Sequence, residues 1–317
     1  NKNDNVIIPA INFVAAANVC NQRGAKIFFA DVDPKTGQMT PETLIKCIKE
    51  NKIRKLKLFF SMYLGGAAKN IEGFSKIKKK YKSMWIEDAC HALGGNYFFK
   101  NKKYKVGNCK YSDISIFSLH PSKIITAGEG GVLTTNKKKF FMRAKNFRSH
   151  SMIKKIDKYN TFNFYEVYEP GNNYRISEIN CSLALSQLMK ISKFLKKRKE
   201  IVNYYKNELK YYKDYIEILN LDYLNNSAWH LLIVKLKSNN SKILRNLLLE
   251  YLKKKNIFPQ LHYIPTNKFK LFKIRKKLIG AENFHDNTLS LPIYYLLSKK
   301  DIRYITQYLK SFFDSIK

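Results

Sequence analysis

Short apolar runs alternate with longer amphipathic stretches along the first half of the chain. A short apolar run bounded by turn residues is typical of a buried strand, and apolar residues three or four apart indicate a helix. Such runs predict strands at Asn5–Pro9, Ala25–Asp31, Lys57–Met62, up to Asp88, at Ile114–Phe117 and at Val132–Thr135. The stretches between them predict helices at Phe13–Cys20, at Pro41 onward behind an N-cap at Thr40, at Asn70–Tyr81 and at Lys137–Phe147. This alternation predicts an α/β fold with a mainly parallel sheet between helices.

The second half of the chain follows a different pattern. We expect one long helix from an N-cap at Ser177 to about Leu209, with an apolar stripe that packs on the core. The stripe consists of Leu183, Leu185, Leu188, Ile191 and Phe194. Beyond it, the pattern predicts strands at Tyr215–Leu219 and Ala228–Leu236 and helices at Ser241–Lys255 and Lys299–Phe312. We therefore expect a large domain over residues 1–200 and a smaller α+β C-terminal domain over residues 201–317.

Two segments of the first domain depart from the strand and helix alternation. Gly94–Lys105 alternates in the manner of a β-hairpin. Residues 151–170 are rich in Tyr, Asn and Lys and predict a flexible excursion from the domain.

The chain is strongly basic, with 59 Lys and Arg against 24 Asp and Glu and a formal net charge of +35. Such a charge can mark a nucleic-acid-binding protein. The lysines are spread along predicted helices rather than gathered in one stripe, and no DNA- or RNA-binding motif is present. We therefore expect a solvated basic surface that helps to attract an anionic substrate. A non-enzymatic basic binding protein is the alternative from another class.

The five cysteines are Cys20, Cys47, Cys90, Cys109 and Cys181. They show no CxxC spacing and no metal-like clustering with histidine, so we predict no metal site. Their pattern favours reduced thiols in a cytosolic protein. The sequence contains no signal peptide and no apolar run long enough to span a membrane, so we predict a cytoplasmic protein without membrane association.

The candidate chemistry lies in a lysine and an aspartate at the carboxyl ends of two predicted strands. Lys123 comes shortly after the strand Ile114–Phe117, and Asp88 ends the strand before it. Open α/β sheets bind ligands beyond the carboxyl ends of their strands. A partly desolvated lysine there acts as a nucleophile, although position alone favours a solvated lysine, so the neighbouring residues must decide. The pair together suggests a pyridoxal-phosphate site, in which lysine holds the aldehyde and a carboxylate keeps the ring nitrogen protonated.

Several motifs resemble the DegT/DnrJ/StrS family of nucleotide-sugar aminotransferases. EDACHALG, FSLHPSKIITAGEGG, NFRSH and NNYRISEINCSLALSQL occur in the family's order, and the similarity covers essentially the whole chain. The resemblance implies a fold-type I pyridoxal-5'-phosphate-dependent transferase. It implies that Lys123 forms the Schiff base and moves the proton of the amino donor, and that Asp88 pairs with the pyridine nitrogen. Relatives that dehydrate sugars carry His at the position of Lys123, so lysine favours transamination.

The resemblance also assigns four further residues to the cofactor. Phe13 matches the aromatic residue that stacks on the ring, and His91 matches a residue near the ring and phosphate. Ser118 matches the residue whose hydroxyl binds the phosphate. Asn173 matches the residue that reaches across a dimer interface to the partner's phosphate, which implies a homodimer.

Four residues match positions on the substrate side of the family's site. Arg148 and His150 belong to the RSH motif of a substrate-side loop. His230 and His262 match positions that border the sugar-nucleotide cleft. For the cofactor candidate His91, a structural role is the alternative.

The motifs look closest to the pseudaminic-acid branch of the family. This implies transfer of an amino group from glutamate to the C4 ketone of a UDP-4-keto-6-deoxy-N-acetylhexosamine. The alternatives are another nucleotide keto-sugar, perosamine-like or with a 3-keto group, and an inactive truncated family member.

The chain opens abruptly on a predicted strand at Asn5. In the family this point is preceded by a region whose Gly-Thr/Ser-Ala turn binds the cofactor phosphate at a helix N-terminus. We therefore expect the N-terminal part of the large domain to be missing, and cofactor retention to be weak.

Overall fold

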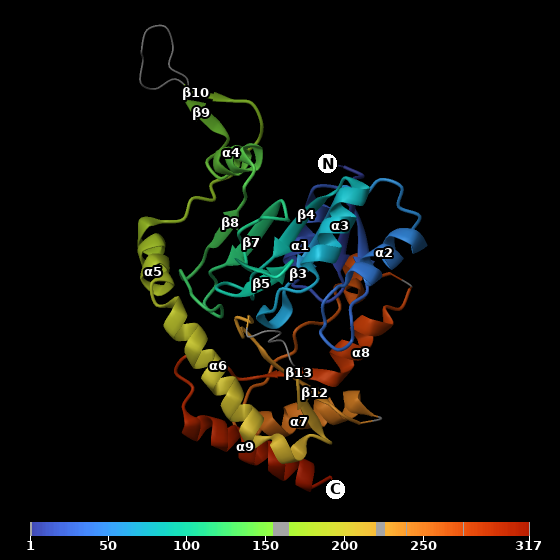
Figure 1. Cartoon of the computed structure of the whole chain (residues 1–317), viewed down its shortest axis with the longest axis vertical. Helices are drawn as coiled ribbons and strands as arrows, with labels where there is room; N and C mark the ends of the chain where they lie inside the picture. Colours follow the sequence, from blue (N-terminus) through green and yellow to red (C-terminus); the bar gives the residue numbers. More distant parts are fainter. Residues whose placement is uncertain (1, 155–164, 220–225, 239, 275, 317) are drawn as a thin grey trace.

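A six-stranded sheet forms the centre of the larger part of the protein (Figure 1). This computed structural model describes residues 2–154, 165–219, 226–238, 240–274 and 276–316. The strand order is β2-β1-β3-β4-β7-β8, with parallel neighbours except for the antiparallel edge strand β8. The strands are β1 Asn5–Pro9, β2 Lys26–Ala30, β3 Leu58–Met62, β4 Met84–Asp88, β7 Ile114–Ser118 and β8 Gly131–Thr134. The predicted mainly parallel α/β sheet is confirmed.

Helices cover the two faces of this sheet unequally. Helix α2 (Pro41–Glu50) and helix α3 (Ile71–Tyr81) pack on one face, and helix α1 (Ala15–Gln22) packs on the other. Neighbouring residues of a strand point to opposite faces. Accordingly, Ile7 belongs to the core beneath α2 and α3, whereas Val6 belongs to the core on the opposite face.

A second, three-stranded antiparallel sheet lies below the first in Figure 1. Its strands are β11 (Ile216–Ile218), β12 (Leu232–Leu236) and β13 (Thr288–Leu291), in that order. The helices of this part are α6 Ile191–Glu208, α7 Ser241–Lys253, α8 Ile279–Asn287 and α9 Lys299–Asp314. Helix α6 crosses the expected domain division at residue 200, which stays a prediction.

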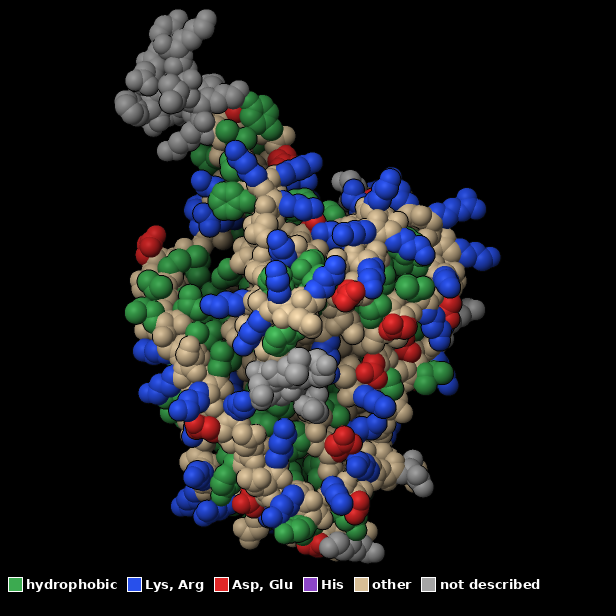
Figure 2. Space-filling model, viewed as in Figure 1, with side chains coloured by type: hydrophobic (Ala, Val, Ile, Leu, Met, Phe, Trp, Pro, Cys, Tyr) green, Lys and Arg blue, Asp and Glu red, His purple; other side chains and the backbone are tan. Residues whose placement is uncertain are grey.

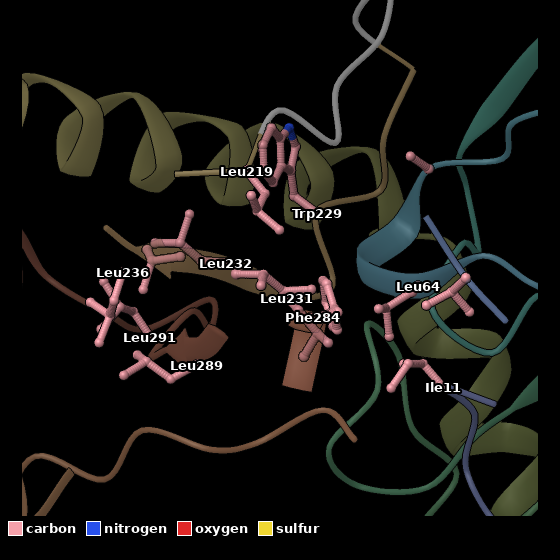
Figure 3. Packing of buried hydrophobic residues seen from close by; sticks show 14 of the residues in the cluster. Ile11, Leu64, Leu219, Trp229, Leu231, Leu232, Leu236, Phe284, Leu289 and Leu291 are labelled. Atoms are coloured by element: carbon pink, nitrogen blue, oxygen red, sulfur yellow. The ribbon is translucent and has the colours of Figure 1, made fainter. Parts of the chain in front are cut away.

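One continuous hydrophobic core joins the two sheets. Figure 3 shows Ile11 and Leu64, from the larger part, beside Leu231 and Phe284 of the smaller part. Trp229 is 2% exposed and packs in the same cluster. Burying apolar area of this extent fixes the second sheet against the first, which holds open the cavity described below.

Local sequence signals are confirmed at several places. Thr40 forms a capping box with Thr43 at the start of α2, and Ser177 caps the following helix by accepting from the Asn180 N–H. The predicted hairpin is formed by β5 (Asn96–Phe99) and β6 (Lys102–Lys105), which pair antiparallel.

The single long helix predicted from Ser177 is wrong. The chain forms α5 (Glu178–Leu188) and then α6, separated at Met189 and Lys190. Lys190 has φ −98° and ψ 1°, outside the helical range, so the helix axis changes direction there (Figure 1).

The core-packing role predicted for the apolar stripe is also wrong over α5. Leu183, Leu185 and Leu188 are 41%, 61% and 46% exposed, because α5 stands at the edge of the molecule beyond the sheet (Figure 1). Ile191 and Phe194, in α6, pack partly buried against a small core cluster. The stripe is therefore divided between a buried and an exposed part.

The excursion predicted as flexible contains regular structure at both ends. β9 (Met152–Lys154) and β10 (Tyr165–Val167) pair antiparallel beyond helix α4 (Lys138–Phe147). Residues 155–164 lie outside the described part of the chain. The prediction of flexibility, which was made from amino-acid composition, missed the backbone pairing between β9 and β10.

Lysine and arginine side chains are scattered over the face of the molecule seen in Figure 2, as the sequence predicts. All five cysteines are free; Cys20, Cys47 and Cys109 are buried, and Cys90 and Cys181 are partly exposed. None of the helices in the described ranges is long and apolar enough to cross a lipid bilayer.

Candidate active site

A cavity of about 1190 Å³ lies between the two sheets, at the carboxyl ends of β3, β4 and β7. The ends of these strands meet there because parallel strands place their carboxyl ends at one edge of a sheet. Of the ten candidate residues, seven line this one cavity: Phe13, Asp88, His91, Ser118, Lys123, His230 and His262. The structure thus brings together residues that the sequence separates by as many as 249 positions.

Asp88 is the buried carboxyl of the cavity. It is the last residue of β4, it is 6% exposed, and its Oδ1 accepts a hydrogen bond from the Cys90 N–H at 3.2 Å. Burial raises the pKa of Asp88, and the Cys90 hydrogen bonds and the charge of Lys123 offset part of that increase. A carboxylate in this position is stabilised by any cation that enters the cavity.

Lys123 lies in the turn that follows β7, where its backbone N–H donates to the His120 carbonyl at 2.9 Å. Its side chain is partly buried in the cavity wall. Burial lowers the pKa of Lys123, while Cys90 and Asp88 raise it in part. Lys123 is therefore close enough to Asp88 to interact electrostatically, and its amine is more easily deprotonated than that of a solvated lysine.

Three histidines form a group in the cavity, in which His91 and His230 are buried and His262 is partly buried. The ring of His91 lies 4.3 Å from that of His230 and 6.4 Å from that of His262, centroid to centroid. Burial lowers the pKa of all three, and the charge of Lys123 adds to the effect; that of His262 falls to about 4. All three are therefore neutral at pH 7 and serve as hydrogen-bonding groups.

Two other candidates stand at the cavity wall. The ring of Phe13 is 57% exposed, which leaves its face free to meet a planar ligand. Ser118 ends β7, and its Oγ accepts from the His120 N–H at 3.2 Å, so its own proton remains available to a ligand.

Arg148, His150 and Asn173 do not line the cavity. They lie where α4 ends: Ser149 forms an isolated bridge with Asn173, and the Asn172 carbonyl accepts from the His150 N–H at 2.9 Å. Figure 1 shows α4, β9 and β10 standing away from the sheet. Within one copy of the chain, these residues are separate from the group around Lys123.

The sequence reasoning missed three residues that shape the cavity. Tyr263 lines it, and its hydroxyl lies 3.0 Å from His91 Nε2. Cys90 lines it beside Asp88, and burial raises the pKa of its thiol. Tyr263 adjoins the candidate His262, and Cys90 lies within the motif EDACHALG, so the sequence indicated where both residues lie but not what they do.

The third missed residue, Arg198, does not line the cavity but binds the backbone of residues in its wall. It is 5% exposed, and its Nη1 donates to the carbonyls of Trp229 and His230, each at 3.1 Å, and of Ile293 at 3.3 Å. Burial lowers the pKa of Arg198 to about 10, so it stays charged at pH 7. The sequence shows that α6 is rich in lysine and arginine, but it does not show that Arg198 is the one that is buried.

A mainly parallel sheet that ends in a cavity with one lysine and one buried carboxyl defines the class of protein: the fold-type I pyridoxal-phosphate-dependent transferases. The chain belongs to the DegT/DnrJ/EryC1/StrS aminotransferase family, which it matches over residues 1–310. It is therefore an aminotransferase of that family, as the resemblance implied.

Its similarity to individual members extends over nearly its whole length. The UDP-4-amino-4,6-dideoxy-N-acetyl-beta-L-altrosamine transaminase of Campylobacter jejuni subsp. jejuni is 32% identical over 98% of this chain and 80% of the relative. The Helicobacter pylori protein of that name is 32% identical over 98% of this chain and 79% of the relative. The solved structure of Helicobacter pylori PseC, an aminotransferase involved in the biosynthesis of pseudoaminic acid, has a TM-score of 0.88 and 31% identity. That likeness covers 99% of this chain and 81% of PseC.

Proposed function

We propose that this protein transfers an amino group from glutamate to the C4 ketone of a UDP-4-keto-6-deoxy-N-acetylhexosamine, using pyridoxal 5'-phosphate. The observation that carries the proposal is the single cavity that Lys123 and Asp88 share, in a chain of this aminotransferase family. The names of the relatives that are 32% identical supply the substrate. Amination of a different nucleotide keto-sugar, perosamine-like or with a 3-keto group, is the alternative.

The residues of the cavity fit pyridoxal phosphate. Among the described residues, the carboxyl of Asp88 receives a hydrogen bond from the Cys90 N–H and has no paired cation at salt-bridge distance, so a protonated pyridine nitrogen would complete its environment. The exposed face of Phe13 suits a flat ring, and the Ser118 hydroxyl suits a phosphate. His230 Nδ1 is buried without a partner in the described part of the chain, so a polar atom of a ligand would satisfy it.

Once bound, pyridoxal phosphate supplies an electron sink that stabilises negative charge at the Cα of the amino donor. Lys123 takes the proton from that Cα, a task for which its lowered pKa suits it. Asp88 keeps the ring nitrogen charged, and its burial strengthens that interaction. The neutral histidines provide hydrogen bonds to the sugar without adding positive charge beside Lys123.

We further propose that the working unit is a homodimer. The exposed apolar side chains of α5 support this, because a contiguous apolar patch on the surface marks an interaction site. Figure 2 shows hydrophobic side chains gathered at the edge of the molecule where α5 lies. In a dimer, Asn173 would bind the phosphate in the partner's cavity and Arg148 and His150 would contact the substrate.

The free cysteines support a reducing compartment, and we propose that the protein works in the cytoplasm.

Replacement of Lys123 tests the function. The protein mixed with pyridoxal phosphate should absorb visible light, and Lys123→Ala should lose that band together with transamination of the UDP-keto-sugar by glutamate. Lys103→Ala, which removes an exposed lysine from β6, is the matched control and should change neither measurement. Full activity in Lys123→Ala would reject the assignment, and a panel of 3-keto and 4-keto nucleotide sugars separates the substrates.

A further inference from the structure

Tyr263 is a residue of the cavity to which no role has yet been given. Its side chain lines the same cavity as Lys123 and Asp88. Its ring lies 6.0 Å from that of Phe13 and 5.0 Å from that of His262, centroid to centroid, so aromatic contacts limit its movement. Its hydroxyl oxygen lies 3.0 Å from His91 Nε2.

The backbone fixes which nitrogen of His91 carries the proton. The Gly65 N–H points at His91 Nδ1, 3.4 Å away, so Nδ1 must present its lone pair. A neutral imidazole has one N–H, and His91 is neutral because burial, His230 and Lys123 lower its pKa. The proton therefore lies on Nε2, and His91 donates to the oxygen of Tyr263. The opposite tautomer would set two N–H groups against each other at Nδ1.

This tautomer determines what the Tyr263 hydroxyl can do. Its oxygen already accepts a hydrogen bond from His91, so its own hydrogen must point to a different acceptor. The described residues provide no such acceptor, and the hydroxyl belongs to the cavity wall. The hydroxyl is thus an oriented donor that requires an acceptor from a bound molecule.

We propose that Tyr263 is a further catalytic residue, whose hydroxyl donates a hydrogen bond to the ketone oxygen of the sugar substrate. This rests on the proposed function. When the transferred amine nitrogen attacks the ketone carbon, a carbon–nitrogen bond forms and the C=O π electron pair moves to the oxygen. The oxygen then takes the two protons that the amine gives up, by way of Lys123, and leaves as water. A fixed donor at that oxygen stabilises the negative charge as it develops.

The environment of Tyr263 suits a donor that keeps its proton. Burial raises the pKa of Tyr263, and the nearby Asp88 and Cys90 raise it further, so the hydroxyl stays protonated wherever the enzyme works. Lys123 remains the group that moves protons, and Tyr263 orients and stabilises. Glutamate brings no ketone, and the ketone oxygen of its product appears only after the proton transfer at Cα that removes the visible band, so loss of that band with glutamate does not depend on this donor.

The two half-reactions separate the proposal from a structural role. Tyr263→Phe should slow amination of the keto-sugar by about 100-fold or more, the usual loss for one donor to a developing oxyanion. The conversion of the cofactor by glutamate, followed by its absorbance change, should stay within about threefold. Calorimetric binding of the keto-sugar to the cofactor-free protein should weaken by no more than about tenfold, since a neutral ketone accepts a weaker hydrogen bond.

Tyr97→Phe is the matched control, because it removes another buried tyrosine hydroxyl, one that donates to Asn108 Oδ1 at 2.7 Å on the far side of the sheet. It should leave both half-reactions unchanged, and thermal melting should show both variants folded. Equal rates for Tyr263→Phe and wild type with the sugar would overturn the role of Tyr263. So would a shifted visible band with both half-reactions slowed, which would place the hydroxyl on the cofactor. Absence of both half-reactions in the wild type would overturn the proposed function itself.

Discussion

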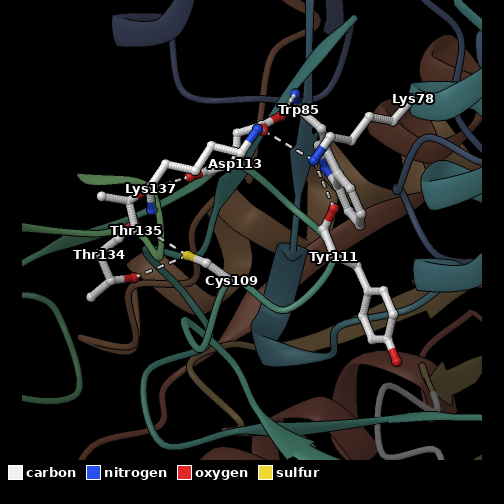
Figure 4. A network of polar contacts seen from close by, with 8 residues as sticks. All are labelled: Lys78, Trp85, Cys109, Tyr111, Asp113, Thr134, Thr135 and Lys137. Atoms are coloured by element: carbon white, nitrogen blue, oxygen red, sulfur yellow. Dashed lines mark hydrogen bonds and ion pairs between the residues drawn. The ribbon is translucent and has the colours of Figure 1, made fainter. Parts of the chain in front are cut away.

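Replacing Asp113 with Asn should destabilise the protein by about 1.5–4 kcal/mol at pH 7. Asp113 is 1% exposed and immediately precedes β7, next to β4. Its Oδ2 accepts from the Trp85 N–H at 2.8 Å, and its Oδ1 accepts from Lys137 and, at 3.0 Å, from Lys78 (Figure 4). This carboxylate fixes the strand that bears Asp88 against the strand that leads to Lys123.

The size of the expected loss in stability depends on how well each hydrogen bond to Asp113 is shielded from water. The Lys78 side chain is 20% exposed, so its bond to the carboxylate contributes about 1.5–3 kcal/mol. That of Lys137 is 52% exposed, so water replaces most of its contribution, leaving about 0–1 kcal/mol. Asn still accepts from the Trp85 N–H, so that bond is kept. Asp113→Ala leaves this N–H unpaired and should cost about 1–3 kcal/mol more.

The charge of Asp113 gives the loss a pH dependence. Burial alone would raise the pKa of Asp113, but the hydrogen bonds from Lys137, Trp85 and Lys78 outweigh it and hold the pKa below 3.8. A lowered carboxyl pKa stabilises the fold above the unfolded-state value and loses that contribution as pH falls through the folded-state value. The difference between wild type and Asp113→Asn should therefore shrink as pH falls below 3.8.

Urea unfolding followed by tryptophan fluorescence measures this difference, since both tryptophans are buried. Glu72→Gln is the control: it breaks an exposed pair with Lys76 and should cost at most about 0.5 kcal/mol. A loss below 0.5 kcal/mol for Asp113→Asn at pH 7 would refute the argument. A loss of the same size at pH 7 and pH 3 would show that the charge is not its cause.

Two further outcomes are expected. Leu185→Glu should convert the proposed dimer to a monomer in sedimentation and leave the melting temperature of the monomer nearly unchanged, because the side chain is 61% exposed in the single chain. A dimer that survives this substitution would exclude α5 as the interface. Lowering the pH from 7 to 5 should reduce the free energy of unfolding, because burial lowers the pKa of His285 to about 4 and the unfolded chain takes up protons first. His285→Asn should remove about 1–2 kcal/mol of that decrease in urea titrations at the two pH values, and equal decreases would contradict the pKa shift.

The sheet and the central pair of the site could be predicted because both depend on local pattern and on one topological rule. Short apolar runs mark the strands, and parallel strands bring their ends together without further information. Asp88 ends β4 and Lys123 lies in the turn after β7, so their convergence needed no knowledge of side-chain packing.

Exposure and the direction of a hydrogen bond depend on the tertiary structure, and the sequence could not supply them. The stripe on α5 has the composition of a buried face, but composition does not say whether the covering surface belongs to the same chain. The hydroxyl of Tyr263 meets His91 across 172 positions, and its direction follows from an N–H at Gly65. Both the exposure of the α5 stripe and the direction of the Tyr263 hydrogen bond can be determined only from the positions of the surrounding backbone.

The motif residues outside the cavity show that a family motif does not reveal whether its residues belong to one site within a single chain. Arg148, His150 and Asn173 match the same family as Lys123, yet they lie near α4, away from this chain's own lysine. A sequence motif records that a residue belongs to a site but not which copy of the chain supplies it. If α5 is the dimer interface, the protrusion formed by α4, β9 and β10 becomes the natural support for residues that complete a partner's cavity. Mixed dimers of Lys123→Ala and Asn173→Ala chains would then contain one cavity with both residues intact, which a monomeric enzyme could never restore.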